Sequence, residues 1–242
     1  DVLPKIGILC AGDDELAPFL PLLDRRSVRR QAMLTIHEGW ISGVPAAALY
    51  SGVCKVNAAI AAQVLIDSCR VEAIINAGTA GGIDPSISIF DTVISTETAY
   101  HDVAEDILTE FHPWMDSIWF PGDPFLLSLA TQAAQDSGRP VRFGRMVTGE
   151  AFLSGPGTGA VRSAFHPLCA DMESAAVAHV CHANGIPFLS IRTITDSADR
   201  SAAACFEENC RRASEIAAQV THALFKRLAA GGPCLIAKGE LP

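Results

Sequence analysis

The chain has 242 residues, of which 49% are hydrophobic and 19% charged, and its formal net charge is −9. This composition predicts a substantial hydrophobic core and suits one large α/β domain. The acidic balance argues against a nucleic-acid partner or an anionic membrane surface, because phosphate groups select basic faces. No apolar run reaches the roughly 20 residues that span a bilayer, and the first residues lack the layout of a signal peptide.

Short apolar, β-branched runs alternate with longer helical patterns along the chain. We expect strands at residues 5–11, 32–38, 45–50, 73–77, 92–99, 144–148 and 187–193, and helices at residues 14–23, 55–68, 124–137, 172–184 and 206–230. This alternation predicts a largely parallel sheet with helices on both faces. A hairpin within residues 32–50, turning through residues 40–44, makes the sheet mixed.

The predicted fold is therefore a single α/β domain over residues 1–230, built on a central mixed sheet. Residues 231–242 are expected to be a C-terminal tail that is disordered or foreign to the natural protein. Residues 101–123 contain two tryptophans without clear periodicity, which is typical of a functional flap or a partner surface. Residues 154–159, rich in glycine, are expected to form a flexible loop.

Acidic side chains stand at the ends of three apolar elements. Glu15 lies in the first turn of a predicted helix and Glu173 one step inside another, whereas Asp196 follows the strand that ends at residue 193. Three carboxylates in one cleft could supply the acid and the base that cleave a glycosidic bond. Helix capping is the competing interpretation, because carboxylates interact favourably with a helix N-terminus. We apply it to Asp13 and Asp14, and keep it open for Asp171 and Glu173.

A glycine-rich segment, Asn76 to Gly82, follows a buried strand. Glycines there let the main chain approach a ligand closely, although a tight turn would explain them equally well. The segment is neither GxGxxG nor a P-loop, which disfavours binding of a dinucleotide or ATP. Lys55, which opens a helix, is interpreted as a solvated or helix-capping residue.

Metal and nucleophile chemistry find little support in the sequence. His179 and His182, at i and i+3 on a helix, supply only half a metal site, so no metal is expected. No GxSxG elbow is present, and Cys54 lacks an identifiable base. The eight cysteines form no CxxC pair, so we expect free, buried thiols in a reducing cytoplasm.

Taken in order, these motifs resemble the 5′-methylthioadenosine/S-adenosylhomocysteine nucleosidases, within the purine nucleoside phosphorylase superfamily. The resemblance rests on Lys5 to Ile8 with Glu15, Ser51 to Val56, Ile75 to Gly82, Tyr100 to Asp102, Thr148 to Phe152, Asp171 to Ala176 and Arg192 to Asp199. It runs from about residue 5 to residue 229. It implies one α/β domain, usually a homodimer, that hydrolyses the adenine–ribose bond of 5′-substituted adenosines without a metal or an organic cofactor.

The resemblance also implies a role for each matching residue. Asp196 would protonate adenine at N7, Glu15 would deprotonate the attacking water, and Arg192 would position that water and the carboxylates. Glu173 would bind the 2′ and 3′ hydroxyls of the ribose.

The remaining matching residues would contact the substrate. Phe152 would stack on adenine, and the backbone of Leu153 would read its edge. Met172 and Phe206 would pack on the ribose and the 5′ substituent. The residues that complete the expected pocket are Val53, Thr79, Gly81 and Thr195.

Two positions and one segment depart from the family pattern. Gly12 stands where the nucleosidases usually carry Met, Thr79 replaces the usual Ser, and residues 105–123 differ from the family's typical stretch. In dimeric relatives that stretch helps cover the 5′ tail bound by the other subunit. The 5′ group therefore stays open among methylthio, homocysteinyl, 5′-deoxy and futalosine-type substituents.

Three alternative functions stay open. A phosphorylase needs cationic groups near the ribose, but residues 13–15 are acidic and the nearest arginines are Arg25 and Arg26, so hydrolysis is favoured. A non-catalytic nucleoside-binding protein would have no need of an acid at N7. A Rossmann-type cofactor binder is disfavoured because GxGxxG is absent.

Overall fold

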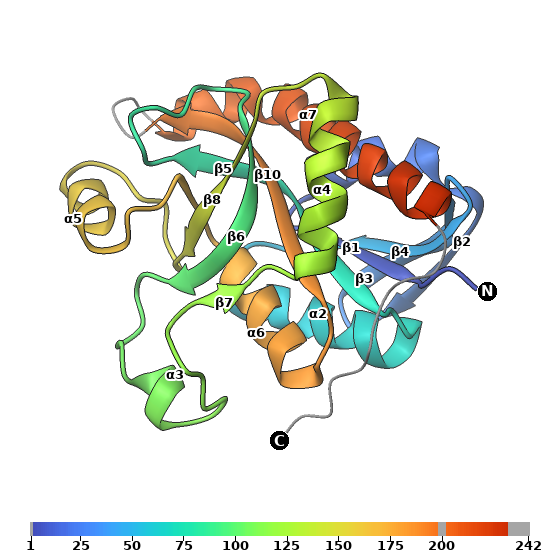
Figure 1. The fold of residues 1–242 in the computed structure, drawn as a ribbon, viewed down its shortest axis with the longest axis horizontal. Coiled ribbons are helices and arrows are strands. Elements are labelled where there is room, and N and C mark those ends of the chain that lie inside the picture. Colours follow the sequence, from blue (N-terminus) through green and yellow to red (C-terminus); the bar gives the residue numbers. More distant parts are fainter. Residues whose placement is uncertain (1, 198–201, 232–242) are drawn as a thin grey trace.

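The computed structural model describes residues 2–197 and 202–231 (Figure 1). The strands are β1 (Ile6–Cys10), β2 (Asp24–Gln31), β3 (Leu34–Ile41), β4 (Val44–Tyr50), β5 (Ala73–Gly82), β6 (Thr92–Tyr100), β7 (Phe120–Pro121), β8 (Val141–Thr148), β9 (Cys169–Asp171) and β10 (Phe188–Ser197). The helices are α1 (Asp13–Leu16), the 3₁₀ helix η1 (Ala17–Leu22), α2 (Lys55–Cys69), α3 (Ile107–Glu110), α4 (Pro124–Ser137), α5 (Pro156–Phe165), α6 (Ser174–Asn184) and α7 (Ala202–Gly231).

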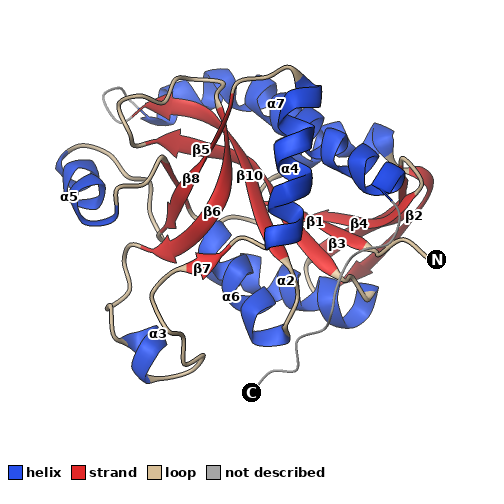
Figure 2. Cartoon of the chain, in the orientation of Figure 1, coloured by secondary structure: helices blue, strands red, loops and turns tan. Residues whose placement is uncertain are grey.

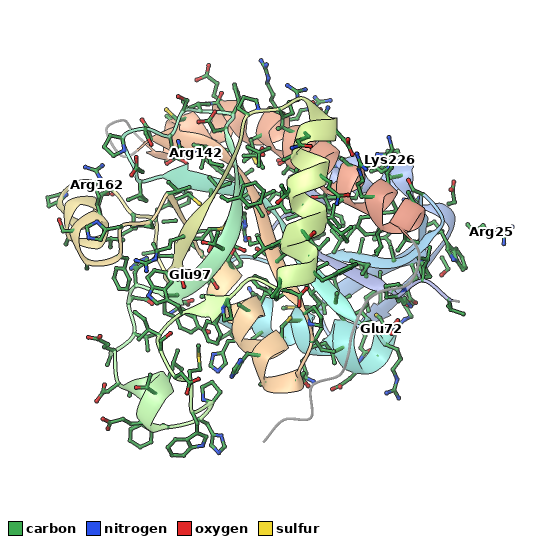
Figure 3. All side chains as sticks on the ribbon, in the orientation of Figure 1. Arg25, Glu72, Glu97, Arg142, Arg162 and Lys226 are labelled. Carbon is green, nitrogen blue, oxygen red and sulfur yellow. The ribbon has the colours of Figure 1, made fainter. Side chains whose placement is uncertain are left out.

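The strands form one mixed sheet that partly closes on itself. Strand β10 pairs with β5 and with β6, and β6 leads through β8 and β9 back to β5. From this ring, β1, β4, β3 and β2 extend as an open wing (Figure 2). The central pairs β1–β4, β1–β5 and β5–β10 are parallel, whereas β3–β4, β5–β9 and β6–β10 are antiparallel. The predicted mixed α/β sheet is confirmed, but its closure was not foreseen.

Two hydrophobic cores lie on opposite faces of the central strands. One core contains side chains of α4 and α7, and the other contains side chains of α2 and α6. Figure 1 shows α4 beside α7 and α2 beside α6. In β5, Ile75 enters the first core and its neighbour Ile74 the second, as alternation along a strand requires. Burial on both faces explains the continuous apolar runs of β1 and β5.

The N-terminal wing differs most from the sequence prediction. The strand expected at residues 32–38 corresponds to β3, with shifted bounds, whereas its partner strand β2 escaped prediction because its side chains are mostly exposed and charged. Exposed charge is a usual protection for the edge of a sheet. The turn to β4 is only Ser42-Gly43, both at positive φ, which suits a tight two-residue hairpin turn and replaces the expected turn at 40–44.

Two helix predictions also need correction. Residues 14–23 are not one α-helix, because α1 ends at Leu16 and η1 follows with Pro21 inside it, where proline cannot donate a hydrogen bond. The prediction of a flexible loop at residues 154–159 is wrong, because α5 begins at Pro156, and proline is well suited to the first helical turn.

The remaining boundaries shift in ways that matter for the site. Strand β5 continues through the glycine-rich segment to Gly82, and β10 continues to Ser197. Gly231 is the last residue of α7, and the rest of the predicted tail, 232–242, lies outside the described residues. Residues 101–123 are irregular apart from α3 and β7. None of the helices within the described ranges has the length and apolar character needed to cross a membrane.

Candidate active site

A cavity of about 290 Å³ opens at the carboxyl ends of the parallel strands β1, β5 and β10. The segment after β8 and the first turns of α7 complete its wall. Strand ends at one edge of a parallel sheet are the usual place for a ligand in α/β proteins. All of the predicted site residues line it: Glu15, Val53, Thr79, Gly81, Phe152, Leu153, Met172, Glu173, Arg192, Thr195, Asp196 and Phe206.

Glu15 enters the cavity from α1 and is held by donors on both carboxylate oxygens. Oε1 accepts hydrogen bonds from the backbone N–H groups of Ala11 and Gly12, at 2.8 and 3.1 Å. Oε2 accepts from the backbone N–H and the hydroxyl of Thr79, at 2.6 and 2.9 Å. A Cβ at Gly78 would lie 2.1 Å from Oε2, so this close packing requires glycine. These four donors fix the orientation of the Glu15 carboxylate.

The neighbouring acids Asp13 and Asp14 lie in the first turn of α1, as the capping interpretation expects. The N-cap residue is Gly12, whose N–H donates a hydrogen bond to Glu15. Both aspartates also line the cavity. Glu15 thus combines the capping contact with a position in the site.

Arg192 is fully buried at the centre of the site. Its guanidinium donates to Asn76 Oδ1 at 3.0 and 2.5 Å and to the Thr79 carbonyl at 2.8 Å. It also lies 3.3 Å from Glu173, 3.4 Å from Asp171 and 3.9 Å from Glu15. Burial by itself would lower the pKa of Arg192, but these carboxylates raise it, so the guanidinium stays charged. Sequence reasoning missed Asn76 as a partner of this arginine.

At the start of α6, Asp171 accepts hydrogen bonds from the first backbone N–H groups, whereas Glu173 faces the cavity. The capping interpretation holds for Asp171, whose Oδ1 accepts from the backbone N–H groups of Glu173 and Ser174 at 3.2 and 3.0 Å. Glu173 is the N-cap residue and not, as predicted, inside the helix. Its Oε2 accepts from the backbone N–H of Cys54 at 2.9 Å. Burial raises the pKa of Glu173 to about 7, although Arg192 acts against this shift.

Asp196 reaches the cavity through an irregularity in β10. Ile194 pairs with Ala80 of β5 and Asp196 with Gly81, which leaves Thr195 as an extra residue. This bulge lets the adjacent residues Thr195 and Asp196 both line the cavity, which strict alternation would forbid. Asp196 Oδ1 accepts from the Thr195 hydroxyl at 2.7 Å. Burial raises the pKa of Asp196, although the Thr195 hydroxyl acts against this shift.

An aromatic wall borders the acidic centre. Phe152, from the segment after β8, meets Phe206 of α7 edge to face with ring centroids 5.9 Å apart. The Phe152 ring is 53% exposed, so it offers a free apolar face to a ligand. Cys210 of α7 also lines the cavity and was not predicted, because a single cysteine in a helix gives no signal of its own.

Two further interpretations concern residues beside the cavity. Lys55 is not a solvated side chain, because its Nζ lies 2.6 Å from Asp102 Oδ1 and the side chain is only 19% exposed. His179 bonds to the Tyr100 hydroxyl at 2.9 Å. Within the described ranges, no group of three or more His, Cys, Asp and Glu side chains could hold a metal ion.

Fold and site together define an α/β protein with a cavity at its strand ends that several carboxylates line. Comparison with known proteins gives the lineage: the chain belongs to the phosphorylase superfamily, whose model matches residues 5–226, and within it to the 5′-methylthioadenosine/S-adenosylhomocysteine nucleosidases. The nucleosidase of Halalkalibacterium halodurans is 37% identical over 231 residues, covering 93% of this chain and all of the relative.

Solved structures give the same result. The nucleosidase of Colwellia psychrerythraea, in complex with adenine, superposes with a TM-score of 0.86 at 30% identity, covering 93% of this chain and 96% of that one. The futalosine hydrolase of Helicobacter pylori gives a TM-score of 0.84 at 25% identity, with coverages of 92% and 97%.

Proposed function

We propose that this chain hydrolyses the N-glycosidic bond of 5′-substituted adenosines, releasing adenine and a 5′-substituted ribose. The convergence of Glu15, Glu173 and Asp196 on one cavity, around the buried Arg192, is the observation that carries the proposal. The nucleosidase relatives and the adenine complex of one of them support the same reaction.

Asp196 acts as the general acid toward N7 of the purine. Its burial raises the pKa of the carboxyl, so more of it carries a proton near neutral pH than a free aspartate would. Protonation at N7 neutralises the negative charge that the departing base develops. A well-placed general acid contributes about 10²–10⁴-fold to the rate.

Glu15 acts as the base that activates the attacking water. Hydrogen bonds from Ala11, Gly12 and Thr79 fix the position of its carboxylate. Acid/base cleavage requires one carboxyl group to accept a proton and another to donate one, and we assign these roles to Glu15 and Asp196. Arg192, 3.9 Å from Glu15, orients this carboxylate and the water beside it.

The other lining residues bind the substrate. Glu173 accepts hydrogen bonds from the 2′ and 3′ hydroxyls of the ribose, and Arg192 holds that carboxylate in place. Phe152 stacks on adenine and the Leu153 backbone contacts its edge. Met172 and Phe206 pack on the ribose and the 5′ substituent, while Val53, Thr79, Gly81 and Thr195 complete the pocket.

Adenine release from 5′-methylthioadenosine in phosphate-free buffer tests this proposal against a phosphorylase. We expect turnover that added phosphate does not raise, because acids at residues 13–15 line the place where a phosphate dianion would have to bind. Production of a ribose 1-phosphate that depends on phosphate would overturn hydrolysis. Tight binding of the nucleoside without turnover would instead indicate a non-catalytic binding protein.

The 5′ substituent is the open part of the substrate, since both methylthioadenosine nucleosidases and a futalosine hydrolase resemble this chain. A panel of adenosines that differ only at the 5′ position would rank the candidates by kcat/KM. We further propose a homodimer with residues 101–123 near the interface and the neighbouring pocket. The exposed side chains of Ile107, Phe111 and Trp114 support it, and sedimentation would test it. The cytoplasmic location stays a prediction.

A further inference from the structure

Three charged residues beside the cavity form a closed ring of hydrogen bonds. Asp102 Oδ1 accepts from Lys55 Nζ at 2.6 Å, and Asp102 Oδ2 accepts from the backbone N–H of Glu150 at 2.9 Å. The side chain of Glu150 closes the ring by accepting from the backbone N–H of Lys55 at 2.8 Å. The ring joins the start of α2, the segment after β6 and the segment after β8. We call Lys55, Asp102 and Glu150 the clamp.

Each side of the clamp is adjacent in sequence to a wall of the cavity. Cys54, which precedes Lys55, donates its backbone N–H to Glu173 Oε2 at 2.9 Å. Ala151, Phe152 and Leu153, which follow Glu150, line the cavity directly. The clamp therefore connects the hydrogen-bond donor of Glu173 to the aromatic wall.

The backbone at Cys54 needs this support. Its φ of 81° lies in a region that residues with a side chain rarely adopt, so neighbouring contacts must hold it. Its own N–H bond to Glu173 and the bond from the Ala58 N–H to its carbonyl, at 3.1 Å, are two of the described contacts there. Two more involve Glu150: the Lys55 N–H bond to its side chain and the approach of Cys54 Sγ to its carbonyl at 3.7 Å. The backbone N–H of Glu150 is in turn fixed by Asp102.

We propose that Asp102 is a positioning residue, which through Lys55 and Glu150 holds the Cys54 amide against Glu173 and the Phe152 wall against the bound base. This inference rests on the proposed function for its kinetic consequence. Asp102 lines no part of the cavity and acts only through its neighbours. Its side chain is 30% exposed, where an ion pair contributes little to global stability. Its effect is therefore local, and variants at this position should fold.

Asp102→Asn is the informative variant, because it keeps the shape of the side chain and removes its charge. Two donors, Lys55 Nζ and the backbone N–H of Glu150, face the carboxylate of Asp102. An asparagine has one acceptor oxygen, so one of these donors would face its NH₂ group and lose its hydrogen bond. We expect hydrogen exchange of the amides of Cys54 and of residues 149–153 to accelerate. Asp106→Asn is the matched control, since Asp106 is an exposed carboxylate in the same segment and outside the clamp.

Kinetics provide the second measurement. We expect kcat/KM of Asp102→Asn to fall about tenfold, mainly through KM, which is the loss expected for one hydrogen bond to a charged group. Glu173 faces Arg192, Asp171 and Glu15 besides the Cys54 amide, and this amide lowers its pKa. Loss of the amide bond should therefore move the acid limb of the kcat/KM profile to higher pH, which a simple loss of folded protein would not do.

A double variant with Lys55→Met completes the design. If Asp102 acts through Lys55, the double variant should be hardly worse than either single one. Unchanged exchange and unchanged KM in an active Asp102→Asn protein would overturn the clamp and leave the proposed function intact. Accelerated exchange in a protein that cleaves no adenosine would support the clamp and overturn the function.

Discussion

Asp196 and Glu15 are both buried carboxylates, but their surroundings predict different consequences of removing the charge. From the residues that the structure describes, Asp196 accepts one hydrogen bond, from Thr195, whereas Glu15 accepts four. Asp196→Asn should lower kcat by about 10²–10⁴-fold without lowering the melting temperature, because burial already disfavours the charged form.

The matched variant for comparison is Glu15→Gln. A glutamine amide would turn its NH₂ group toward the backbone donors of Ala11 or Thr79. We therefore expect this variant to lose activity and also about 1–3 kcal/mol of stability, the cost of an unsatisfied buried group. Steady-state kinetics and thermal unfolding of both variants measure these losses of activity and stability. An active Asp196→Asn protein would contradict the acid role of Asp196.

Glu173 should leave a signature in the pH dependence of stability. Its pKa in the folded protein, about 7, lies above the ordinary value of 4.5, so the folded state binds more protons than the unfolded state between these limits. The contribution of Glu173 to the free energy of unfolding should thus fall as pH rises through this window, by at most about 1.4 kcal/mol per pH unit, and stay level above it.

Glu173→Gln removes the titrating group and should flatten that part of the curve. Denaturant unfolding of both proteins from pH 4.5 to pH 7.5 measures the difference. Curves that run parallel across the window would show that the carboxyl of Glu173 titrates normally in the folded protein.

Strand β5 shows how an element, and not only a side chain, builds the site. Its last residues approach Glu15 so closely that a Cβ at Gly78 would meet the carboxylate at 2.1 Å. Gly78→Ala should therefore displace Glu15 and lower kcat by at least about tenfold, since a misplaced catalytic group loses its alignment. Activity assays alongside circular dichroism would separate this effect from unfolding.

Gly12→Ala is the control for that experiment. Gly12 also contacts Glu15 through its backbone, but a Cβ there meets nothing within 4 Å. The backbone bond to Glu15 survives in alanine, so kcat should stay within about twofold of the original protein, and any loss should appear in KM because Gly12 lines the cavity. Equal losses in both variants would mean that the close packing of β5 on Glu15 is not what matters.

The two largest hydrophobic cores of the described residues are separated by the central strands. Ile75 belongs to the core under α4 and α7, and Ile36 of β3 to the core under α2 and α6. Each Ile→Val change should cost about 0.5–1.5 kcal/mol, and because the two cores share no side chains the costs should add to within about 0.5 kcal/mol in the double variant. Denaturant unfolding of the four proteins tests this. A large coupling would indicate that the cores respond to mutation as one.

Much of the fold could be predicted because apolar periodicity is a local property. The burial of β1 and β5 on both faces appears in the sequence as continuous apolar runs. Strand β2 could not be found in this way, since it is an edge strand with exposed, charged side chains. Helix α5 was missed because glycine dominates its first turn, and only Pro156 hinted at a helix start.

Glu15, Glu173 and Asp196 were singled out by their position at the ends of apolar elements, and the family resemblance added the other site residues. All of them line one cavity. What each one does there depends on neighbours that are distant along the chain. Glu15 and Thr79 are 64 residues apart, and Cys54 and Glu173 are 119 residues apart. The sequence by itself determined which side chains are present and where strands expose them. Only the tertiary structure decided their hydrogen bonds, their burial and so their charge, because these properties arise when separate strand ends share one enclosed space.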